Sequence, residues 1–237
     1  MTPLVFVHGF MGGSDQWQAQ QGLAGLICVD LPGFGRNAHL DPLHSIADFA
    51  AWVLSDLSRQ GVDRFDLLGH SMGGMIVQEM VHQAPDRVAR LILYATGSVG
   101  VLPGRFETID TSMQRARTDG AEATARRIAA TWFLTREDAP GYPACADIAA
   151  RANLPAIIAG LEAMRDWSGA AYLPSITAKT LVLWGDRDRT YAWPQIETLW
   201  RTIQDCHLAV VPQCAHAVHA ERPEFFNRLV VDFLREG

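Results

Sequence analysis

One short segment of the sequence carries the spacing expected of a nucleophilic serine. Residues 69–73 read Gly-His-Ser-Met-Gly, a G-x-S-x-G pattern with Ser71 at its centre. The pattern follows an apolar run that predicts a strand and precedes a stretch that predicts a helix. In such a junction, small flanking residues allow a tight turn, and the serine hydroxyl is held at the positive end of the helix dipole. We therefore predict that Ser71 is a nucleophile.

A base and an acid for this serine follow two later apolar runs. Leu181–Trp184 is followed by Asp186 and Asp188, and Leu208–Val211 is followed by His216. A serine hydroxyl needs a base to remove its proton, and the base needs an acid to orient it. Both runs predict buried strands of a parallel sheet, and the carboxyl ends of such strands meet at one edge. We expect the serine, an aspartate and the histidine at that edge.

Short apolar runs alternate with helical patterns along most of the chain. Apolar residues at helical spacing predict a helix from Ile46 after a capping Ser45, another over Met72–Ala84, and a third that begins at Pro223. This alternation indicates an α/β fold with a mainly parallel sheet of about six strands flanked by helices. The predicted strands are Leu4–Val7, Leu26–Val29, Phe65–Leu68, Leu91–Tyr94, Leu181–Trp184 and Leu208–Val211.

Residues 98–172 interrupt the alternation. They show no strand pattern, only helical patterns separated by Pro and Gly. A connection of this length requires structure of its own. We therefore predict a core formed by residues 1–97 and 173–237, with residues 98–172 as a helical lid. The aromatic side chains of this segment either pack against the sheet or line a substrate pocket, and we expect Trp132 and Phe133 to contact substrate.

With these residues in view, the chain resembles the α/β-hydrolases, and in particular their lidded, serine esterase-like members, over nearly its whole length. The resemblance implies that Ser71 is the nucleophile and His216 the general base. It implies that Asp188 is the acid, since the family places it three residues after the glycine that ends the strand. Asp186 is the rival acid, with capping of its loop as the alternative role. By the same resemblance, His219 lines the site.

The first loop supplies the remaining part of the resemblance. His8-Gly9-Phe10 follows the first predicted strand, as does the His-Gly-x motif of the family. The resemblance implies an oxyanion hole made by the backbone N–H groups of Phe10 and Met72. Such donors stabilise the developing oxyanion by roughly 3–4 kcal/mol each. No metal or organic cofactor is implied.

Composition limits the classes of partner. The chain has 237 residues, of which 49% are hydrophobic and 19% charged, with a formal net charge of −6. This balance predicts a folded protein and gives no electrostatic reason to bind nucleic acid or an anionic membrane. The N-terminal residues lack a secretory signal pattern, and the four cysteines are widely spaced, so we expect a cytoplasmic protein with free thiols. We expect it to be a monomer or homodimer.

These features favour a serine hydrolase that cleaves carboxylic esters of small-to-medium apolar substrates through an acyl-enzyme. The same triad also serves lactonases, thioesterases, carrier-protein methyl ester esterases and carbon–carbon bond hydrolases. The last group carries a Gly-Pro-Gly type of oxyanion loop, whereas residues 10–13 here are Phe-Met-Gly-Gly. A ligand-binding receptor or an inactive relative is the alternative from a different class.

Overall fold

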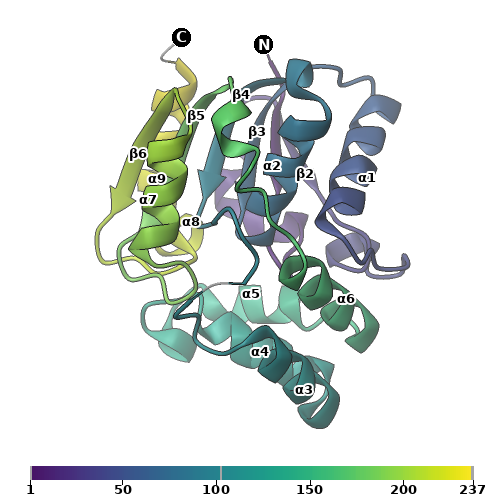
Figure 1. Cartoon of the computed structure of the whole chain (residues 1–237). Coiled ribbons are helices and arrows are strands. Elements are labelled where there is room, and N and C mark those ends of the chain that lie inside the picture. Colours follow the sequence, from purple (N-terminus) through teal and green to yellow (C-terminus); the bar gives the residue numbers. More distant parts are fainter. Residues whose placement is uncertain (1, 102, 236–237) are drawn as a thin grey trace.

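The computed structural model describes residues 2–101 and 103–235. This part of the chain forms one sheet of six strands, which are β1 (Leu4–Val7), β2 (Leu26–Val29), β3 (Phe65–His70), β4 (Val88–Tyr94), β5 (Lys179–Gly185) and β6 (Cys206–Val211). Their order is β2-β1-β3-β4-β5-β6, and every neighbouring pair is parallel (Figure 1). Each predicted strand is found: β1 and β2 have the predicted bounds, and the other four extend beyond theirs by two or three residues.

Helices cover both faces of the sheet (Figure 1). The helices outside the segment between β4 and β5 are α1 (Ile46–Arg59), α2 (Met72–Gln83), α7 (Trp193–Thr202), α8 (Val218–Glu221) and α9 (Pro223–Arg235). Alternate strand residues point to opposite faces of the sheet. Val5 and Val7 belong to the core cluster that contains side chains of α1, α2 and α7, whereas Leu4 and Phe6 belong to the cluster that contains side chains of α9. Short 3-10 helices span Ser14–Gln20, Gly35–Asn37, Pro85–Arg87, Arg136–Asp138 and Leu173–Ser175.

The predicted helix starts are found where the sequence placed them. The Ser45 side chain accepts a hydrogen bond from the backbone N–H of Asp48 at 3.0 Å, which caps the first turn of α1. Pro223 opens α9, where a residue without an N–H donor is tolerated. The helix after Ser71 ends at Gln83, one residue before the predicted end.

The described residues between β4 and β5 contain four α-helices: α3 (Ile109–Asp119), α4 (Ala121–Ala130), α5 (Tyr142–Ala149) and α6 (Leu154–Arg165). They lie across the carboxyl ends of the strands (Figure 1). The two ends of this segment lie side by side, because Gly100 N–H donates to the Trp167 carbonyl and Gly169 N–H donates to the Ser98 carbonyl. Side chains from all four helices join the main core cluster, so the segment is packed onto the sheet.

Among the described residues, no single helix combines the length and the apolar character that a membrane span requires; the bent pair α5 and α6, at 98° to each other, meets that test only when the two are taken together.

Candidate active site

Ser71 lies on a strained turn between β3 and α2. Its backbone adopts φ 57° and ψ −119°, a region that residues with side chains rarely occupy. A Cβ at Gly69 would lie 2.3 Å from the Gly73 carbonyl oxygen, and a Cβ at Gly73 would lie 2.3 Å from the Val7 carbonyl oxygen. Both flanking positions of the G-x-S-x-G pattern therefore require glycine. Thr96 fixes the turn further, since its hydroxyl donates to the Ser71 carbonyl at 2.8 Å.

Asp188 and His216 lie together, at the edge of the sheet where the sequence places them. His216 Nδ1 lies 2.8 Å from Asp188 Oδ2, and both side chains are almost completely buried. The other Asp188 oxygen accepts hydrogen bonds from the backbone N–H groups of Thr190 and Tyr191 at 2.7 and 3.2 Å. The carboxylate is thereby held so that His216 Nδ1 faces it and Nε2 is left for another partner.

Asp186 has a different environment. Its Oδ1 accepts a hydrogen bond from the backbone N–H of Gln213 at 2.8 Å, and its Oδ2 lies 3.8 Å from Arg187 Nε. Asp186 therefore connects the loop after β5 to the loop that carries His216. These contacts favour the interpretation of Asp186 as a residue that caps its loop, and not as the acid that orients His216.

The loop after β1 approaches Ser71 closely. A Cβ at Gly9 would lie 3.0 Å from Ser71 Cβ. The His8 ring braces this loop, with Nδ1 2.8 Å from the Gly9 carbonyl and Nε2 3.0 Å from the Leu31 nitrogen. Within the described residues, no acceptor is paired with the backbone N–H of Phe10 or of Met72. Both donors that the oxyanion hole would need are thus uncommitted.

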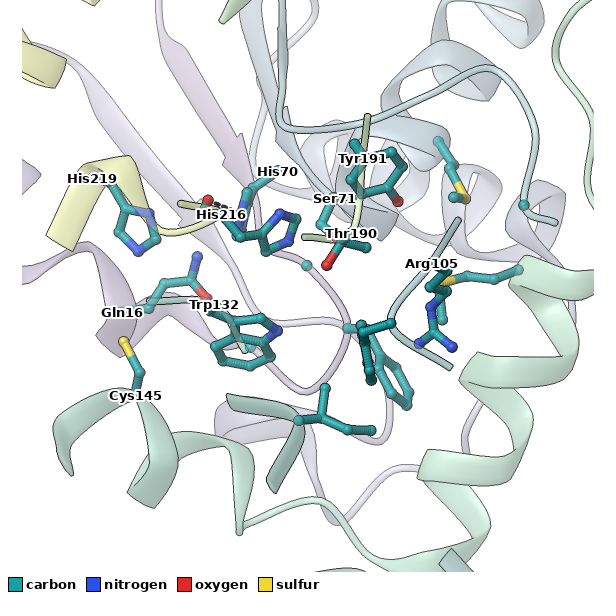
Figure 2. A pocket seen from close by; sticks show the side chains of 18 of the residues that line it. Gln16, His70, Ser71, Arg105, Trp132, Cys145, Thr190, Tyr191, His216 and His219 are labelled. Atoms are coloured by element: carbon teal, nitrogen blue, oxygen red, sulfur yellow. Dashed lines mark hydrogen bonds between the residues drawn. The ribbon is translucent and has the colours of Figure 1, made fainter. Parts of the chain in front are cut away.

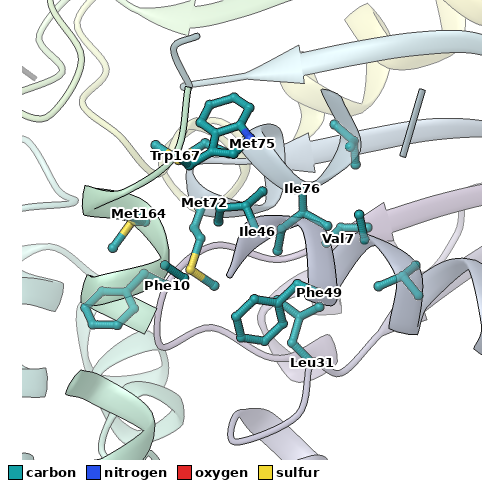
Figure 3. Close-up of a cluster of buried hydrophobic side chains, with 14 of the residues drawn as sticks. Val7, Phe10, Leu31, Ile46, Phe49, Met72, Met75, Ile76, Met164 and Trp167 are labelled. Carbon is teal, nitrogen blue, oxygen red and sulfur yellow. The ribbon is translucent and has the colours of Figure 1, made fainter. Parts of the chain in front are cut away.

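The Phe10 side chain has a structural role beside its backbone. Its ring packs edge-on against Phe34 at a centroid distance of 6.0 Å, in the core cluster that also contains Met72 and Met164 (Figure 3). A Cβ at Gly160 of α6 would come within 2.9 Å of the ring. The loop after β1 is therefore packed directly against the segment between β4 and β5.

One pocket contains Ser71 and His216 (Figure 2). Its cavity volume is about 30 Å³. The described lining residues are Gly9, Phe10, Gly12, Gln16, His70, Ser71, Met75, Gly100, Arg105, Phe106, Ile109, Ile128, Trp132, Cys145, Ile148, Met164, Thr190, Tyr191, His216 and His219. Most come from the segment between β4 and β5 or from the loops at the carboxyl edge of the sheet.

The structure brings Trp132 and His219 to this pocket but not Phe133. The Phe133 side chain is completely buried in a separate cluster with Ala139, Cys145 and Ala217. The expectation that Phe133 contacts substrate is therefore corrected. The physical reason is that α4 ends at Ala130, so the chain turns there and neighbouring aromatic side chains point in different directions.

Three histidines form a buried group in the lining of the pocket that contains Ser71. The ring centroids of His70 and His216 are 4.6 Å apart, and those of His70 and His219 are 5.3 Å apart. The Tyr94 hydroxyl bonds to the His216 carbonyl and to His219 Nδ1, both at 3.0 Å. Burial lowers the pKa of His219 to about 3 and holds the pKa of His70 well below its usual range. Both rings are therefore neutral near pH 7 and serve as packing and hydrogen-bonding groups.

A backbone segment at the end of α4 joins the loops that carry Asp188 and His216. Arg189 donates to the carbonyls of Phe133 and Leu134 at 2.7 and 3.0 Å. Glu221 accepts from the Leu134 and Ala215 N–H groups at 2.6 and 2.7 Å. These contacts fix the end of α4 to the loops on either side of the Asp188–His216 pair.

Comparison with known proteins decides the family. The model of the alpha/beta hydrolase family matches residues 4–229, nearly the whole chain. The chain belongs to this family.

Relatives of this alpha/beta hydrolase have several activities. It is 31% identical to the putative carbamate hydrolase RutD of Variovorax paradoxus, over 97% of this chain and 91% of that protein. It is 26% identical to a 2-hydroxy-6-oxo-6-phenylhexa-2,4-dienoate hydrolase of Comamonas testosteroni, over 98% of this chain and 87% of that one. A thermophilic esterase from Thermogutta terrifontis superimposes with a TM-score of 0.89 at 24% identity, covering 100% of this chain and 90% of that one.

Several lining residues of this alpha/beta hydrolase were not expected from the sequence. Tyr191 is buried and lines the same pocket as Ser71, and burial raises the pKa of Tyr191 to about 12. Gln16 and Arg105 line the pocket on opposite sides of Ser71 (Figure 2). The position of Tyr191, three residues after Asp188, is a local signal for an Asx-type turn, whereas nothing local indicated Gln16 or Arg105.

Proposed function

We propose that this alpha/beta hydrolase cleaves carboxylic esters through an acyl-enzyme formed on Ser71. The observation that carries the proposal is the buried 2.8 Å contact between Asp188 and His216, in the pocket that contains a strained Ser71. A buried aspartate on Nδ1 stabilises the tautomer and the imidazolium that general-base catalysis needs. This stabilisation favours transfer of a proton from the Ser71 hydroxyl to His216 Nε2.

The reaction would proceed in two halves. Ser71 Oγ attacks the ester carbonyl while His216 Nε2 takes its proton, and the N–H groups of Phe10 and Met72 donate to the tetrahedral oxyanion. The C–O bond then breaks, and His216 returns the proton to the leaving alcohol. A water molecule next attacks the acyl-enzyme with His216 as base, which releases the acid and restores Ser71. Asp188 orients His216 throughout and stays ionised.

The pocket lining supports apolar groups on the substrate. Trp132, Ile128 and Ile148 come from the segment between β4 and β5 and face Ser71 across the pocket. We infer that this segment, residues 98–172, acts as a lid whose inner surface contacts the acyl or alcohol group. Apolar area removed from water contributes about 25 cal/mol per Å², so the length of an alkyl chain should affect the turnover.

The test is hydrolysis of p-nitrophenyl esters from acetate to laurate by the wild-type protein and by Ser71→Ala. We expect turnover in the wild type, loss of at least about 10³-fold in the variant, and an unchanged circular dichroism spectrum. Turnover by a folded Ser71→Ala protein at the wild-type rate would refute the acyl-enzyme. A matched serine away from the pocket is Ser58, whose hydroxyl bonds to the Leu54 carbonyl, and Ser58→Ala should keep full activity.

Carbon–carbon bond hydrolysis is the second candidate, because several relatives carry names of that reaction. Besides the Comamonas protein, these include hydrolases of 2-hydroxy-6-oxononadienedioate from Pseudomonas putida and Klebsiella pneumoniae, each 27% identical to this chain. The two candidates are separated by offering a 2-hydroxy-6-oxo-dienoate beside the esters. Turnover of the dienoate with no turnover of any ester would replace the proposed function by this one.

A further inference from the structure

Arg105 is a half-buried arginine in the connection between β4 and α3, and it lines the pocket that contains Ser71 (Figure 2). Its Nη1 donates to the Glu107 carbonyl at 2.9 Å and to Ser112 Oγ at 3.2 Å. The guanidinium stands over the Phe106 ring, 4.6 Å from its centroid. These contacts hold the cation in one place and leave its Nε and Nη2 groups without a hydrogen-bond partner among the described residues.

The neighbouring carboxylate is already engaged elsewhere. Glu107 Oε2 lies 2.9 Å from Arg127 Nη1 and 3.4 Å from Arg115 Nη1, and Oε1 accepts from the Ser112 hydroxyl. Within the part of the chain that the structure describes, Arg105 has no carboxylate within ion-pair distance. The described lining of the pocket contains no aspartate or glutamate, so no carboxylate of the lining is paired with the positive charge of Arg105.

Such a placement favours an anionic ligand. Partial burial weakens the hydration of the Arg105 guanidinium, and an anion that accepts charge-assisted hydrogen bonds offsets that loss. Two further groups can donate on the same side of Ser71 (Figure 2). Thr190 Oγ1 is buried and without a partner among the described residues, and Tyr191 lies in the lining of the same pocket. A planar carboxylate suits the two free N–H groups of a guanidinium.

We propose that Arg105 binds a carboxylate on the substrate, so that the preferred substrates are esters that carry a second, free carboxylate. This inference rests on the proposed function, since it names the substrate class of the same site. The apolar surface between Arg105 and Ser71 would then contact the chain that connects the carboxylate to the scissile ester. Arg105 acts in this scheme as a specificity-determining residue, because it touches substrate away from the reacting atoms.

The test compares matched pairs of substrates in a pH-stat. Monomethyl esters of dicarboxylic acids, from succinate to pimelate, place the carboxylate on the acyl side, and O-acetyl derivatives of ω-hydroxy acids place it on the alcohol side. Each is compared with the neutral ester of the same chain length. A charge-assisted hydrogen bond predicts a kcat/KM about 10- to 100-fold higher for the acidic ester in at least one pair.

Variants assign that preference to Arg105. Arg105→Gln should lower kcat/KM much more for the acidic ester than for the neutral ester of each pair, so that the preference is lost, and Arg105→Lys should restore part of it. Arg117, an exposed arginine on α3, supplies the matched control, and Arg117→Gln should keep the full preference. If Arg105→Gln lowers kcat/KM equally for acidic and neutral esters, the residue only holds its loop, and the inference fails.

A binding measurement separates this inference from the proposed function. Calorimetric titration of the Ser71→Ala protein with monomethyl glutarate needs no turnover. Binding that is lost in Ser71→Ala/Arg105→Gln supports the carboxylate site even if the wild type hydrolyses no ester, in which case only the reaction is wrong. The absence of preference in every substrate pair, together with equal affinity for monomethyl glutarate and methyl pentanoate, overturns the inference.

Discussion

Mild acid should destabilise this fold because His219 is buried as a neutral ring. Burial lowers the pKa of His219 from 6.5 to about 3, and the charge of His216 acts in the same direction. Above pH 6.5 the ring is neutral in both the folded and the unfolded chain, so its contribution is independent of pH. Below pH 6.5 the unfolded chain takes up a proton that the folded chain does not, and stability falls until about pH 3.

The magnitude follows from the two pKa values. At about 1.4 kcal/mol per pH unit, His219 alone lowers the free energy of unfolding by about 2 kcal/mol at pH 5, with a limit near 5 kcal/mol. His70, whose pKa is lowered by the same cause, adds to this loss. The effect is large beside the usual total stability of about 5–15 kcal/mol for a folded protein.

The assay is urea unfolding at pH values from 8 to 5, with the wild type compared with His219→Gln. The variant loses the hydrogen bond to Tyr94 at every pH, so the comparison uses the change between pH 7.5 and pH 5 within each protein. We expect that change to be about 2 kcal/mol smaller in His219→Gln. The exposed His39 supplies the control, and His39→Gln should behave as the wild type. Equal pH dependence in wild type and His219→Gln would refute the reasoning.

Three further predictions concern the site and its support. Asp188→Asn should lower kcat roughly 10³- to 10⁴-fold, because an amide favours the wrong His216 tautomer, whereas Asp186→Asn should cost far less; equal losses in steady-state assays would contradict the assignment of the acid. Gly73→Ala places a Cβ 2.3 Å from a β1 carbonyl oxygen and should lower the free energy of unfolding by about 1–3 kcal/mol. The control is Gly22→Ala, whose Cβ meets no atom within 4 Å and should cause no such steric loss. Urea titrations measure both free energies. Trp132→Ala should shift the preferred ester toward longer chains, and an unchanged chain-length profile would count against a lid-lined pocket.

The sequence predicted most of the sheet because parallel strands buried on both faces must be nearly continuous apolar runs. The exceptions are instructive. β4 begins at Val88 and not at Leu91, because Arg90 forms a bidentate pair with Asp66 on the adjacent β3 at 2.8 Å. That partner lies distant in sequence, so no local pattern reveals that an arginine can stand within a strand.

The candidate site was predictable to a similar extent and for a related reason. Ser71, Asp188 and His216 follow strands, and the common edge of a parallel sheet brings strand ends together whatever the loops do. Phe133 and Arg105 lie between β4 and β5, where side-chain direction depends on how four helices pack. Helical periodicity gives the apolar face of each helix but not the contacts beyond its last turn, so Phe133 was misplaced and Arg105 was missed.

The contacts of the pocket walls have a consequence for where substrate can enter. A wall that is bonded to the loops carrying Asp188 and His216 cannot move without moving them, whereas a wall without such bonds can.

The end of α4 cannot move independently, because Arg189 and Glu221 connect its backbone to the loops that carry Asp188 and His216. An opening on the side of Phe106 and Ile109 leaves that pair undisturbed. The hydrolase can then admit and release ligands while Asp188 and His216 stay in contact, and an opening slower than the chemical steps would set kcat.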